Sequence, residues 1–447
     1  MSPKTAATLS RAVPRYTSYP TAPHFHAGLP AATFRGWLAE LADGEEISLY
    51  VHIPYCDRLC WFCACHTKQT RRYEPVDAYL RSLRDEIAMV GAITAGKVRA
   101  VHFGGGSPTM LRPDDLIALD RALRKAFAYL PDTEISVEID PNDMDEARFD
   151  ALAAIGMTRA SLGVQDFDPK VQRAINREQS FEQTAAVVEA VRSCGVRSVN
   201  LDLLYGLPHQ TRDSVASTVK CALALEPDRI ALFGYAHVPW FKKHQMMIDE
   251  AWLPGAGDRF AQSRLASDLI ERSGYQEVGL DHFARPGDTL AVAARNGRLR
   301  RNFQGYTDDR CATLIGLGPS SISRLHQGYA QNTTVTGDYE RKIAGGELAV
   351  ARGMQFTDDD RIRGWVIERL MCDFAFSSQE LVRRFGESAQ ALVAEAECHA
   401  ASDPDRLFER RGDLFVVADE GRPLVRTIAA KFDRYLGANQ ARHSVAV

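Results

Sequence analysis

The sequence predicts an α/β fold with a parallel sheet, preceded by an N-terminal arm and followed by a mainly helical C-terminal domain. Between about residues 45 and 236, short apolar segments alternate with helix-like segments, which is typical of repeated βαβ units. Residues 1–25 contain four prolines and no helical or strand periodicity. The units suit either a partial barrel or a doubly wound sheet, and periodicity alone does not decide between these folds.

Six segments of the α/β region are predicted strands. In chain order they are 48–53, 99–105, 134–139, 159–164, 198–206 and 229–236. The predicted helices between them are 77–91, 113–127, 145–155, 181–193 and 211–225. A further β-like segment, 275–284, extends this region. In either fold we expect the chemistry at the carboxyl ends of the strands.

The strand pattern fades beyond about residue 335. Helices are predicted there at 359–372, 378–399 and about 423–437, with a short β-like piece at 414–419. The predicted organisation therefore has three parts, which are the arm (1–35), the catalytic domain (36–335) and the C-terminal domain (336–447).

The composition excludes several classes of protein. The 447 residues are 45% hydrophobic and 25% charged, with a net charge of −4, so no global basic field attracts nucleic acid. No apolar run is long enough to cross a membrane, and the first residues lack the apolar core of a signal peptide. We therefore expect a cytoplasmic protein that binds neither nucleic acid nor a membrane.

A cluster of cysteines directly follows the first predicted strand, at Cys56, Cys60, Cys63 and Cys65. Such crowding argues against a disulfide scaffold. Thiolates bind iron–sulfur clusters, and three cysteines leave one iron of a cubane open for a substrate. Structural zinc is the alternative, but zinc prefers paired CxxC knuckles and four ligands, and no second pair follows. The spacing predicts a [4Fe–4S] cluster on Cys56, Cys60 and Cys63.

Polar or glycine-rich positions end several other predicted strands. The second strand runs into three glycines, 104–106, and Ser107, where a ligand can approach the backbone, although a tight turn also explains them. Glu138, Gln165 and Asp202 follow three further strands and indicate one shared polar site. In this site Asp202 could accept hydrogen bonds from ribose hydroxyls and Glu138 could bind an ammonium group.

For each of two further residues, the sequence allows two interpretations. Arg177 could pair with a carboxylate or be a solvated charge at a helix end. His52 shares one face of the first strand with Tyr50, so it could point into the same cavity or be a core histidine.

The motif CxxxCxFC at 56–63 resembles the signature of the radical S-adenosylmethionine (SAM) superfamily. This resemblance implies that the methionine moiety of SAM binds the open iron and that one electron then splits SAM into methionine and a 5′-deoxyadenosyl radical. Much of the chain also resembles the oxygen-independent coproporphyrinogen III oxidase family of haem biosynthesis. The segments that carry this second resemblance are PRYTSYPTA (14–22), SLYVHIPYC (48–56), GVQDF (163–167), NLDLLYGLPHQT (200–211), YAHVP (235–239), DHFARP (281–286), RNFQGYT (301–307) and YAQN (329–332).

The resemblance implies a partial (β/α)6-type barrel and a specific reaction. Two propionates of coproporphyrinogen III are decarboxylated to vinyl groups, giving protoporphyrinogen IX, with one SAM consumed for each. Two SAM molecules bind beside the cluster, and an electron donor such as flavodoxin or ferredoxin supplies electrons. The expected oligomeric state is a monomer.

Carried over by motif, the site residues form three groups. Contacts to the first SAM are expected from Tyr50, Gly105, Glu138 and Ile322. Contacts to the second are expected from Phe62, Gly106, Ser107, Gln165, Arg177, Asp202 and Ala236. Phe303 and Gln304 match positions on the substrate side, and the catalytic set is Tyr50, His52, Glu138, Phe303, Gln304 and Ile322. Cys65 matches a family cysteine that is not a ligand.

Two alternatives remain open at this point. One is a haem-binding chaperone derived from the same enzymes, and the other is a radical methyltransferase that opens the haem ring. By charge alone, the candidates for binding the substrate's propionates are Arg15, Lys68, Arg71 and Arg72, although a solvated run of surface charges more commonly explains such residues. The arm is expected to fold over the barrel mouth as a lid.

Overall fold

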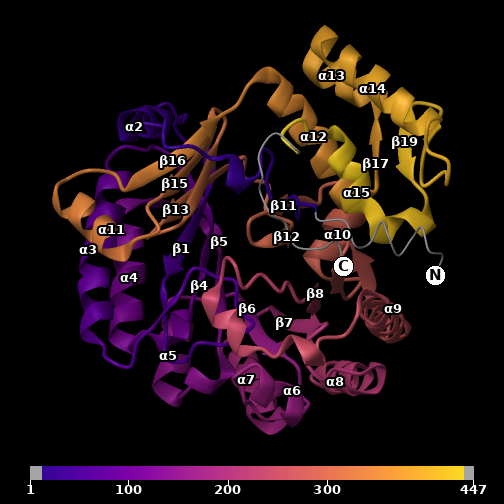
Figure 1. Cartoon of the computed structure of the whole chain (residues 1–447). Helices are drawn as coiled ribbons and strands as arrows, with labels where there is room; N and C mark the ends of the chain where they lie inside the picture. Colours follow the sequence, from indigo (N-terminus) through magenta and orange to yellow (C-terminus); the bar gives the residue numbers. More distant parts are fainter. Residues whose placement is uncertain (1–12, 437–447) are drawn as a thin grey trace.

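A twelve-stranded sheet forms the centre of the computed structural model, which describes residues 13–436 (Figure 1). Its six central strands are mutually parallel: β1 (Glu46–Ile53), β4 (Lys97–Gly105), β5 (Ala128–Ile139), β6 (Arg159–Gln165), β7 (Ser198–Tyr205) and β8 (Arg229–Gly234). The connecting helices are α3 (Glu74–Gly91), α4 (Pro113–Ala126), α5 (Glu146–Ala154), α6 (Pro169–Ala174), α7 (Phe181–Ser193) and α8 (Arg212–Ala224). The predicted α/β fold with repeated βαβ units is confirmed.

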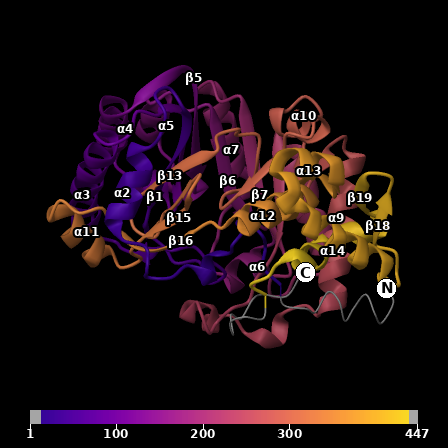
Figure 2. The ribbon, with the colours of Figure 1, turned by 90° about the horizontal axis from the view of Figure 1, so that it is seen from above.

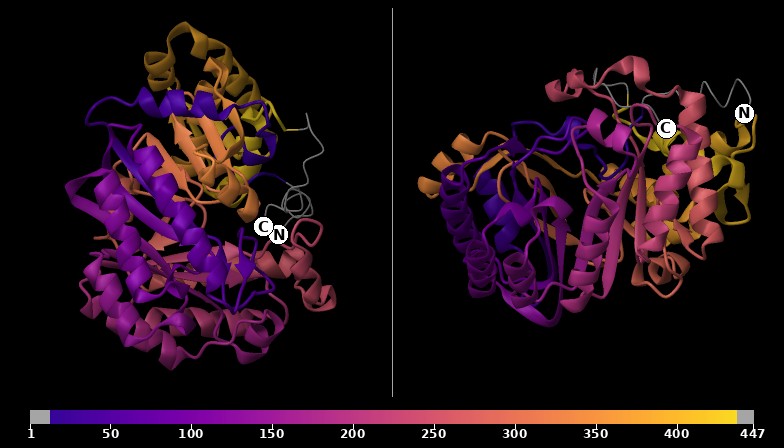
Figure 3. Two further views of the ribbon diagram at one scale, coloured as in Figure 1. Left: turned by 90° about the vertical axis from the view of Figure 1, so that its left-hand side faces the viewer. Right: turned by 90° about the horizontal axis from the view of Figure 1, so that it is seen from below.

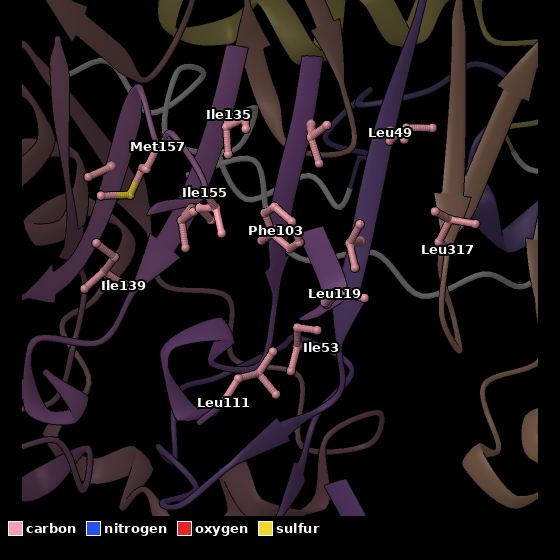
Figure 4. Packing of buried hydrophobic residues seen from close by; sticks show 14 of the residues in the cluster. Leu49, Ile53, Phe103, Leu111, Leu119, Ile135, Ile139, Ile155, Met157 and Leu317 are labelled. Carbon is pink, nitrogen blue, oxygen red and sulfur yellow. The ribbon is translucent and has the colours of Figure 1, made fainter. Parts of the chain in front are cut away.

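Successive side chains of each strand point alternately to the hydrophobic core and to the interior of the barrel. On β1, Leu49, Val51 and Ile53 belong to the core beneath the helices, so Tyr50 and His52 face the opposite side. Figure 4 shows Leu49, Ile53 and Phe103 from the strands together with Leu119 of α4 and Leu317 of a neighbouring strand. Burying each such side chain contributes roughly 1.5–3 kcal/mol, so the helical layer holds the polar inner face in place.

Further strands extend the sheet at both edges without closing it. One edge continues through β13 (Thr313–Leu317), β14 (Ile322–Leu325), β15 (Gly328–Asn332) and β16 (Val350–Gln355), and the other through β10 (His282–Ala284) and β9 (Gln276–Val278). Within the described residues β16 and β9 are the two free edges, so the predicted partial barrel is confirmed. The strands β13 to β16 were not predicted, because short hairpin strands such as GYAQN carry little alternation.

A second hydrophobic cluster lies in the C-terminal part of the chain, beside the barrel (Figure 2). Its elements are α12 (Asp358–Asp373), β17 (Ala375–Ser377), α13 (Ser378–Phe385), α14 (Gln390–Ala401), β18 (Phe408–Arg411), β19 (Leu414–Val417) and α15 (Val425–Ala429). The predicted helix 378–399 is interrupted at Gly386, whose φ of 66° ends α13. The predicted helix at 423–437 is only α15 with a 3₁₀ turn on either side, and Pro423 lies in the first turn.

The boundary regions of the three predicted parts are packed against neighbouring elements. Helix α11 (Thr336–Ala344) packs on α3, and β16 pairs with β15, so both lie with the large sheet. Residues 1–12 of the predicted arm and 437–447 of the predicted C-terminal domain lie outside the described residues. The division into three domains stays a prediction.

The described part of the arm contacts both the barrel and the C-terminal helices. His26 pairs with Gly353 of β16, followed by helix α2 (Ala31–Ala39), and Figure 3 shows this indigo segment beside the orange strands. Tyr16 is buried, and its hydroxyl donates to Asp433 at 3.0 Å. The proposed role of the arm as a lid stays a prediction. In the described part of the chain, no helix combines the length and apolar character needed to span a membrane.

Replacing Glu86 by leucine is expected to lower the free energy of unfolding by about 2–4 kcal/mol. The buried Glu86 carboxylate on α3 accepts hydrogen bonds from the Gly318 amide at 2.7 Å, the Asn332 amide at 2.6 Å and the Tyr339 hydroxyl at 2.8 Å. The leucine would leave these donors unpaired. Denaturant unfolding of the variant and of Asp85→Leu, a change at an exposed neighbour on the same helix, measures the difference; equal midpoints would contradict it.

Candidate functional site

The cysteine loop leaves β1 and is fixed at both ends. Cys56 lies in β2 (Tyr55–Cys56), which pairs with β3 (Lys68–Gln69), so the loop that carries the other three cysteines closes on itself. The Trp61 amide donates to the Ile175 carbonyl at 2.9 Å, and the Asn176 side chain donates to the Leu59 carbonyl at 2.9 Å. The loop is therefore held against the end of α6, at the carboxyl ends of the strands.

Hydrogen-bond donors surround the three predicted ligand sulfurs. Arg177 Nη1 lies 3.5 Å from Cys60 Sγ, the Cys65 amide donates to Cys63 Sγ at 3.4 Å, and Thr67 Oγ1 lies 3.1 Å from Cys56 Sγ. Hydrogen bonding to the Cys65 side chain lowers the pKa of Cys63 to about 7, whereas burial raises the pKa of Cys56 to about 12. The environment thus favours a thiolate most strongly at Cys63.

These thiols fit an iron–sulfur cluster by their chemistry and surroundings. Among residues 13–436, no three His, Cys, Asp or Glu side chains converge as ligands of a single metal ion. A [4Fe–4S] cluster binds each thiolate through a different iron, so its ligands need not converge on one point. Cys56, Cys60 and Cys63 on one loop, with the Arg177 guanidinium to offset their negative charge, suit this group.

The glycine-rich turn after β4 brings the backbone close to Glu138 and His52. A Cβ atom on Gly104 would lie 2.6 Å from Glu138 Oε1, and one on Gly105 would lie 2.5 Å from His52 Nδ1. Gly105 also has a φ of 112°, which L side chains rarely adopt. The amide of Gly106 donates to the Ile53 carbonyl at 2.7 Å, so the turn continues the pairing with β1. These glycines are required for close packing around the site.

Glu138 lies at the centre of a group of polar side chains on the inner face of the barrel. Its carboxylate accepts from the Gly105 amide at 3.0 Å and lies 3.1 Å from His102 Nε2. Burial opposes ionisation, but these two partners outweigh it and hold the pKa of Glu138 below its usual value. The backbone of Ile322 on β14 would lie 2.9 Å from a Cβ atom on Gly316, and Gly316 lies on β13 directly opposite Tyr50 of β1.

Tyr50 and His52 form a directed pair beside this carboxylate. Tyr50 Oη lies 3.0 Å from His52 Nδ1, and His52 Nε2 lies 2.8 Å from the His66 carbonyl. Burial lowers the pKa of His52 to about 4, so the ring is neutral near pH 7. Because Nε2 must donate to the carbonyl, Nδ1 is the acceptor of the Tyr50 hydroxyl. His52 thus shares the inner face with Tyr50, and its catalytic role stays a prediction.

A second polar group surrounds Arg177, which is buried rather than solvated. Its guanidinium donates to Asp140 Oδ2 at 2.9 Å and to the Gly163 carbonyl at 2.6 Å, and its side chain also lies near the Gln165 amide. The Ser107 hydroxyl donates to Asp143. Sequence reasoning missed Asp140, although it lies only two residues beyond Glu138 in the same motif.

Gln245 connects two of the predicted SAM contacts. Its side-chain amide donates to the Phe62 carbonyl at 2.9 Å and to the Ala236 carbonyl at 3.2 Å, while its oxygen accepts from the Val238 amide at 2.6 Å. Gln245 is fully buried and fixes the cysteine loop to the end of β8. No motif in the sequence marks this residue, so only the structure identifies it.

The inner face of the barrel encloses a cavity of about 840 Å³, including the part open to solvent. Gln304, at the turn between β11 (Arg300–Asn302) and β12 (Gly305–Thr307), lines this cavity together with His102. Phe303 lies elsewhere, edge-on to Tyr329 with ring centroids 5.7 Å apart. The lining of this cavity does not include Glu138, Tyr50 or His52, so the structure places Gln304 toward the other end of the barrel and Phe303 in a neighbouring cavity.

SAM affinity is expected to fall about three- to fourfold between pH 7.5 and pH 5.5, because Asp202 gains a proton. Burial, with Glu138 as the next cause, raises the pKa of Asp202 to about 6, while Asn200 donates to it at 2.8 Å. Only the carboxylate accepts hydrogen bonds from two ribose hydroxyls at once. Anaerobic equilibrium dialysis of SAM at both pH values measures the effect.

The matched variant for this pH dependence is Asp202→Asn, which is expected to bind SAM more weakly at pH 7.5 and with a flat pH profile. If the SAM affinity of this variant still depends on pH as in wild type, the assignment of the pH dependence to Asp202 is wrong. The raised pKa also affects stability: the folded state holds this proton more tightly than the unfolded state, so stability from Asp202 is lost as pH rises from about 4 through 6.

The open α/β barrel with three thiols on the loop after its first strand defines a radical SAM protein. Residues 50–222 match the model of the radical SAM superfamily. Membership of this superfamily implies a [4Fe–4S] cluster and SAM.

Similar proteins over nearly the whole length define the family more closely. The chain is 48% identical over 438 residues to the oxygen-independent coproporphyrinogen III oxidase of Bradyrhizobium diazoefficiens, with 97% of each chain covered. It is 49% identical over 437 residues to that of Paracoccus denitrificans, with 97% of this chain and 96% of the relative covered. The structure of coproporphyrinogen III oxidase (HemN) from Escherichia coli superposes with a TM-score of 0.90 at 38% identity, covering 95% of this chain and 100% of that one. The chain belongs to the oxygen-independent coproporphyrinogen III oxidase family.

Proposed function

We propose that this protein is an oxidoreductase that converts two propionates of coproporphyrinogen III to vinyl groups without oxygen, giving protoporphyrinogen IX in haem biosynthesis. The observation that carries the proposal is the loop of three thiols beside Arg177 and Glu138, in a chain similar over 97% of its length to relatives named for this activity. The relatives' names favour the oxidase over the haem-binding chaperone and the ring-opening methyltransferase.

Cys56, Cys60 and Cys63 would hold the cluster, which would supply the electron for cleavage of SAM. Each reacting propionate would then lose a hydrogen atom to the 5′-deoxyadenosyl group, lose CO₂ and pass one electron to an acceptor, leaving a vinyl group. The residues of the chain bind and orient the reactants. Glu138 keeps lone pairs for the ammonium group of SAM, because His102 and Gly105 occupy only part of its carboxylate. Tyr50 and His52 line the same face and hold their hydroxyl and ring in one orientation.

Two SAM molecules are part of the proposal, as the family resemblance implies. Two groups of predicted contacts support this: Glu138 with Gly105, and Arg177 with Gln165 near the cysteine loop. The glycines between them let ligands approach the backbone from either side. Equilibrium dialysis of labelled SAM is expected to give two equivalents per chain, and one equivalent at saturation would contradict this part.

The chemistry of SAM cleavage and the site residues also bear on the electron donor, the cellular location and the oligomeric state. SAM cleavage consumes electrons, so we infer a one-electron donor such as flavodoxin or ferredoxin. All nine cysteines are free thiols, which supports a reducing location such as the cytoplasm. One chain carries every predicted site residue, which supports a monomer.

An anaerobic assay tests the activity. The cluster-loaded protein is given reductant, SAM and coproporphyrinogen III, CO₂ and 5′-deoxyadenosine are measured, and the porphyrinogen product is quantified as protoporphyrin after chemical oxidation. The expected result is one protoporphyrin and two CO₂ for every two 5′-deoxyadenosines. Formation of 5′-deoxyadenosine without protoporphyrin would reject this substrate, a linear tetrapyrrole would favour the methyltransferase, and stoichiometric haem binding without turnover would favour the chaperone.

A further inference from the structure

A second large cavity, of about 1040 Å³ including its opening to solvent, lies at the carboxyl end of β8. Its walls come from the arm, from the helix α9 (Ala256–Arg272), from the turn before β10 and from the C-terminal region. Six arginines line it but only three carboxylates, so its wall carries an excess of positive charge. We call Arg15, Arg259, Arg301 and Arg426 the arginine pocket.

The donors of the arginine pocket are only partly used. Arg15 donates to the Gly234 carbonyl at 3.0 Å, Arg259 to the Tyr235 carbonyl at 2.6 Å and Arg301 to the Arg15 carbonyl at 3.3 Å. Within residues 13–436, these three guanidinium groups donate no hydrogen bond to a carboxylate. The buried Nε atoms of Arg259 and Arg301 have no hydrogen-bond partner among the described residues.

Asp281, a half-buried carboxylate that lines this pocket, already has a partner. Its Oδ1 atom lies 2.7 Å from His282 Nδ1 and 3.9 Å from Arg301 Nη1, beyond hydrogen-bond distance. Burial, followed by repulsion from Arg15 and Arg301, lowers the pKa of Arg426 to about 10. Asp281 therefore offsets only part of the positive charge of Arg15 and Arg301.

In the arginine pocket Arg301 is buried, Arg259 is half-buried and Arg15 is exposed, whereas two half-buried arginines elsewhere in the fold have carboxylate partners. At the opposite end of the barrel, Arg159 contacts Glu134 and lies 3.1 Å from Asp308, and Arg229 lies 2.7 Å from Asp288. Buried charges need such partners because desolvation is costly. The contrast indicates that the arginine pocket is completed by an anion from outside the chain.

We propose that the arginine pocket binds carboxylates of the tetrapyrrole substrate, namely the propionates that do not react. This inference rests on the proposed function and adds the residues that recognise the substrate. Coproporphyrinogen III carries four propionates and two of them become vinyl groups, so two stay as anions throughout. A guanidinium presents paired N–H donors that match a carboxylate.

The position of the arginine pocket relative to the radical site supports this occupant. Ala236 lines the pocket and is also a predicted SAM contact, and the Gly234 carbonyl that holds Arg15 lies at the end of the same strand. A tetrapyrrole held here by its unreactive propionates presents its other side chains toward the SAM site. Of the basic residues suggested by charge alone, Arg15 lines the pocket, whereas Lys68, Arg71 and Arg72 are exposed on the surface.

The test compares cluster-loaded wild type with Arg259→Gln and Arg15→Gln, and uses Arg383→Gln, an exposed arginine 3.9 Å from Glu380, as the control. Binding of coproporphyrin III and of its tetramethyl ester is followed by fluorescence without SAM, and KM for coproporphyrinogen III is measured in the full assay. Each pocket variant is expected to weaken coproporphyrin III binding and raise KM at least 10-fold, with unchanged SAM affinity. The ester is expected to bind weakly to every variant and to wild type.

The outcomes separate this inference from the proposed function. Unchanged KM and coproporphyrin affinity in both pocket variants would overturn the arginine pocket even if wild type makes protoporphyrin. A loss of SAM affinity with unchanged coproporphyrin binding would assign the pocket to the SAM carboxylate and also overturn it. Arginine-dependent binding of coproporphyrin III by a wild type that makes no protoporphyrin would uphold the pocket and reject the activity. Cluster absorbance and circular dichroism verify that each variant is folded, and Arg259→Lys is expected to recover part of the affinity.

Discussion

The Cys60→Ser variant is expected to lose the [4Fe–4S] cluster and at least 1000-fold in protoporphyrin formation. Cys60 Sγ is buried beside Arg177 Nη1, so a cluster at this loop is held where a guanidinium offsets its charge. Serine is a poor ligand for iron at neutral pH, because its hydroxyl keeps its proton at a pH at which an iron-bound thiol loses it. Anaerobic reconstitution, with iron content, absorbance near 400 nm and product formation, measures both effects.

The matched control is Cys65→Ser on the same loop. Cys65 lies two residues beyond Cys63, is hydrogen-bonded to it through its backbone amide, and is assigned no iron. The control is expected to keep the cluster with four irons per chain and to alter activity far less than Cys60→Ser. If Cys65→Ser loses the cluster while Cys60→Ser retains it, the assignment of ligands is wrong.

The sequence was sufficient for the parallel core because its pattern is regular. The strands 48–53 and 99–105 were predicted from apolar runs, and the structure has β1 at Glu46–Ile53 and β4 at Lys97–Gly105. At the edge of the sheet, pairing with neighbouring strands forms further strands from segments whose apolar pattern is too weak to predict them. The segment 350–355 is a strand because β15 and the arm lie against it, and these contacts leave no periodic signal.

The same limit of prediction from sequence applies to single residues of the candidate site. The cysteine spacing and the polar strand ends predict the loop and Glu138, because chemistry restricts those residue types. Gln245 and Asp140 act through contacts with segments far away in the sequence, at Phe62 and Arg177, so no local pattern marks them. The excess of arginines around the second cavity likewise depends on four segments meeting in space.

Changing Glu138 to glutamine is expected to weaken SAM binding roughly 10- to 100-fold and to lower 5′-deoxyadenosine formation to a similar degree. The substitution keeps the size of the side chain and an oxygen for the Gly105 amide, but it removes the charge that faces the ammonium group of SAM. His102 and Gly105 together hold the pKa of Glu138 below its usual value against burial, so the wild-type carboxylate is ionised at neutral pH. Equilibrium dialysis of SAM with the cluster-loaded variant measures the loss.

Glu134→Gln is the control for this effect, because it removes a carboxylate from the same strand at the opposite end, where Glu134 contacts Arg159. Cluster content and SAM affinity are expected to match wild type in the control, since the proposed site for the ammonium group lies at the Glu138 end of the barrel. Equal losses in both variants would mean that general charge in the barrel, rather than a contact at Glu138, governs SAM binding. A selective loss in Glu138→Gln at unchanged cluster content assigns the contact to this carboxylate, because both substitutions remove one negative charge from the same strand.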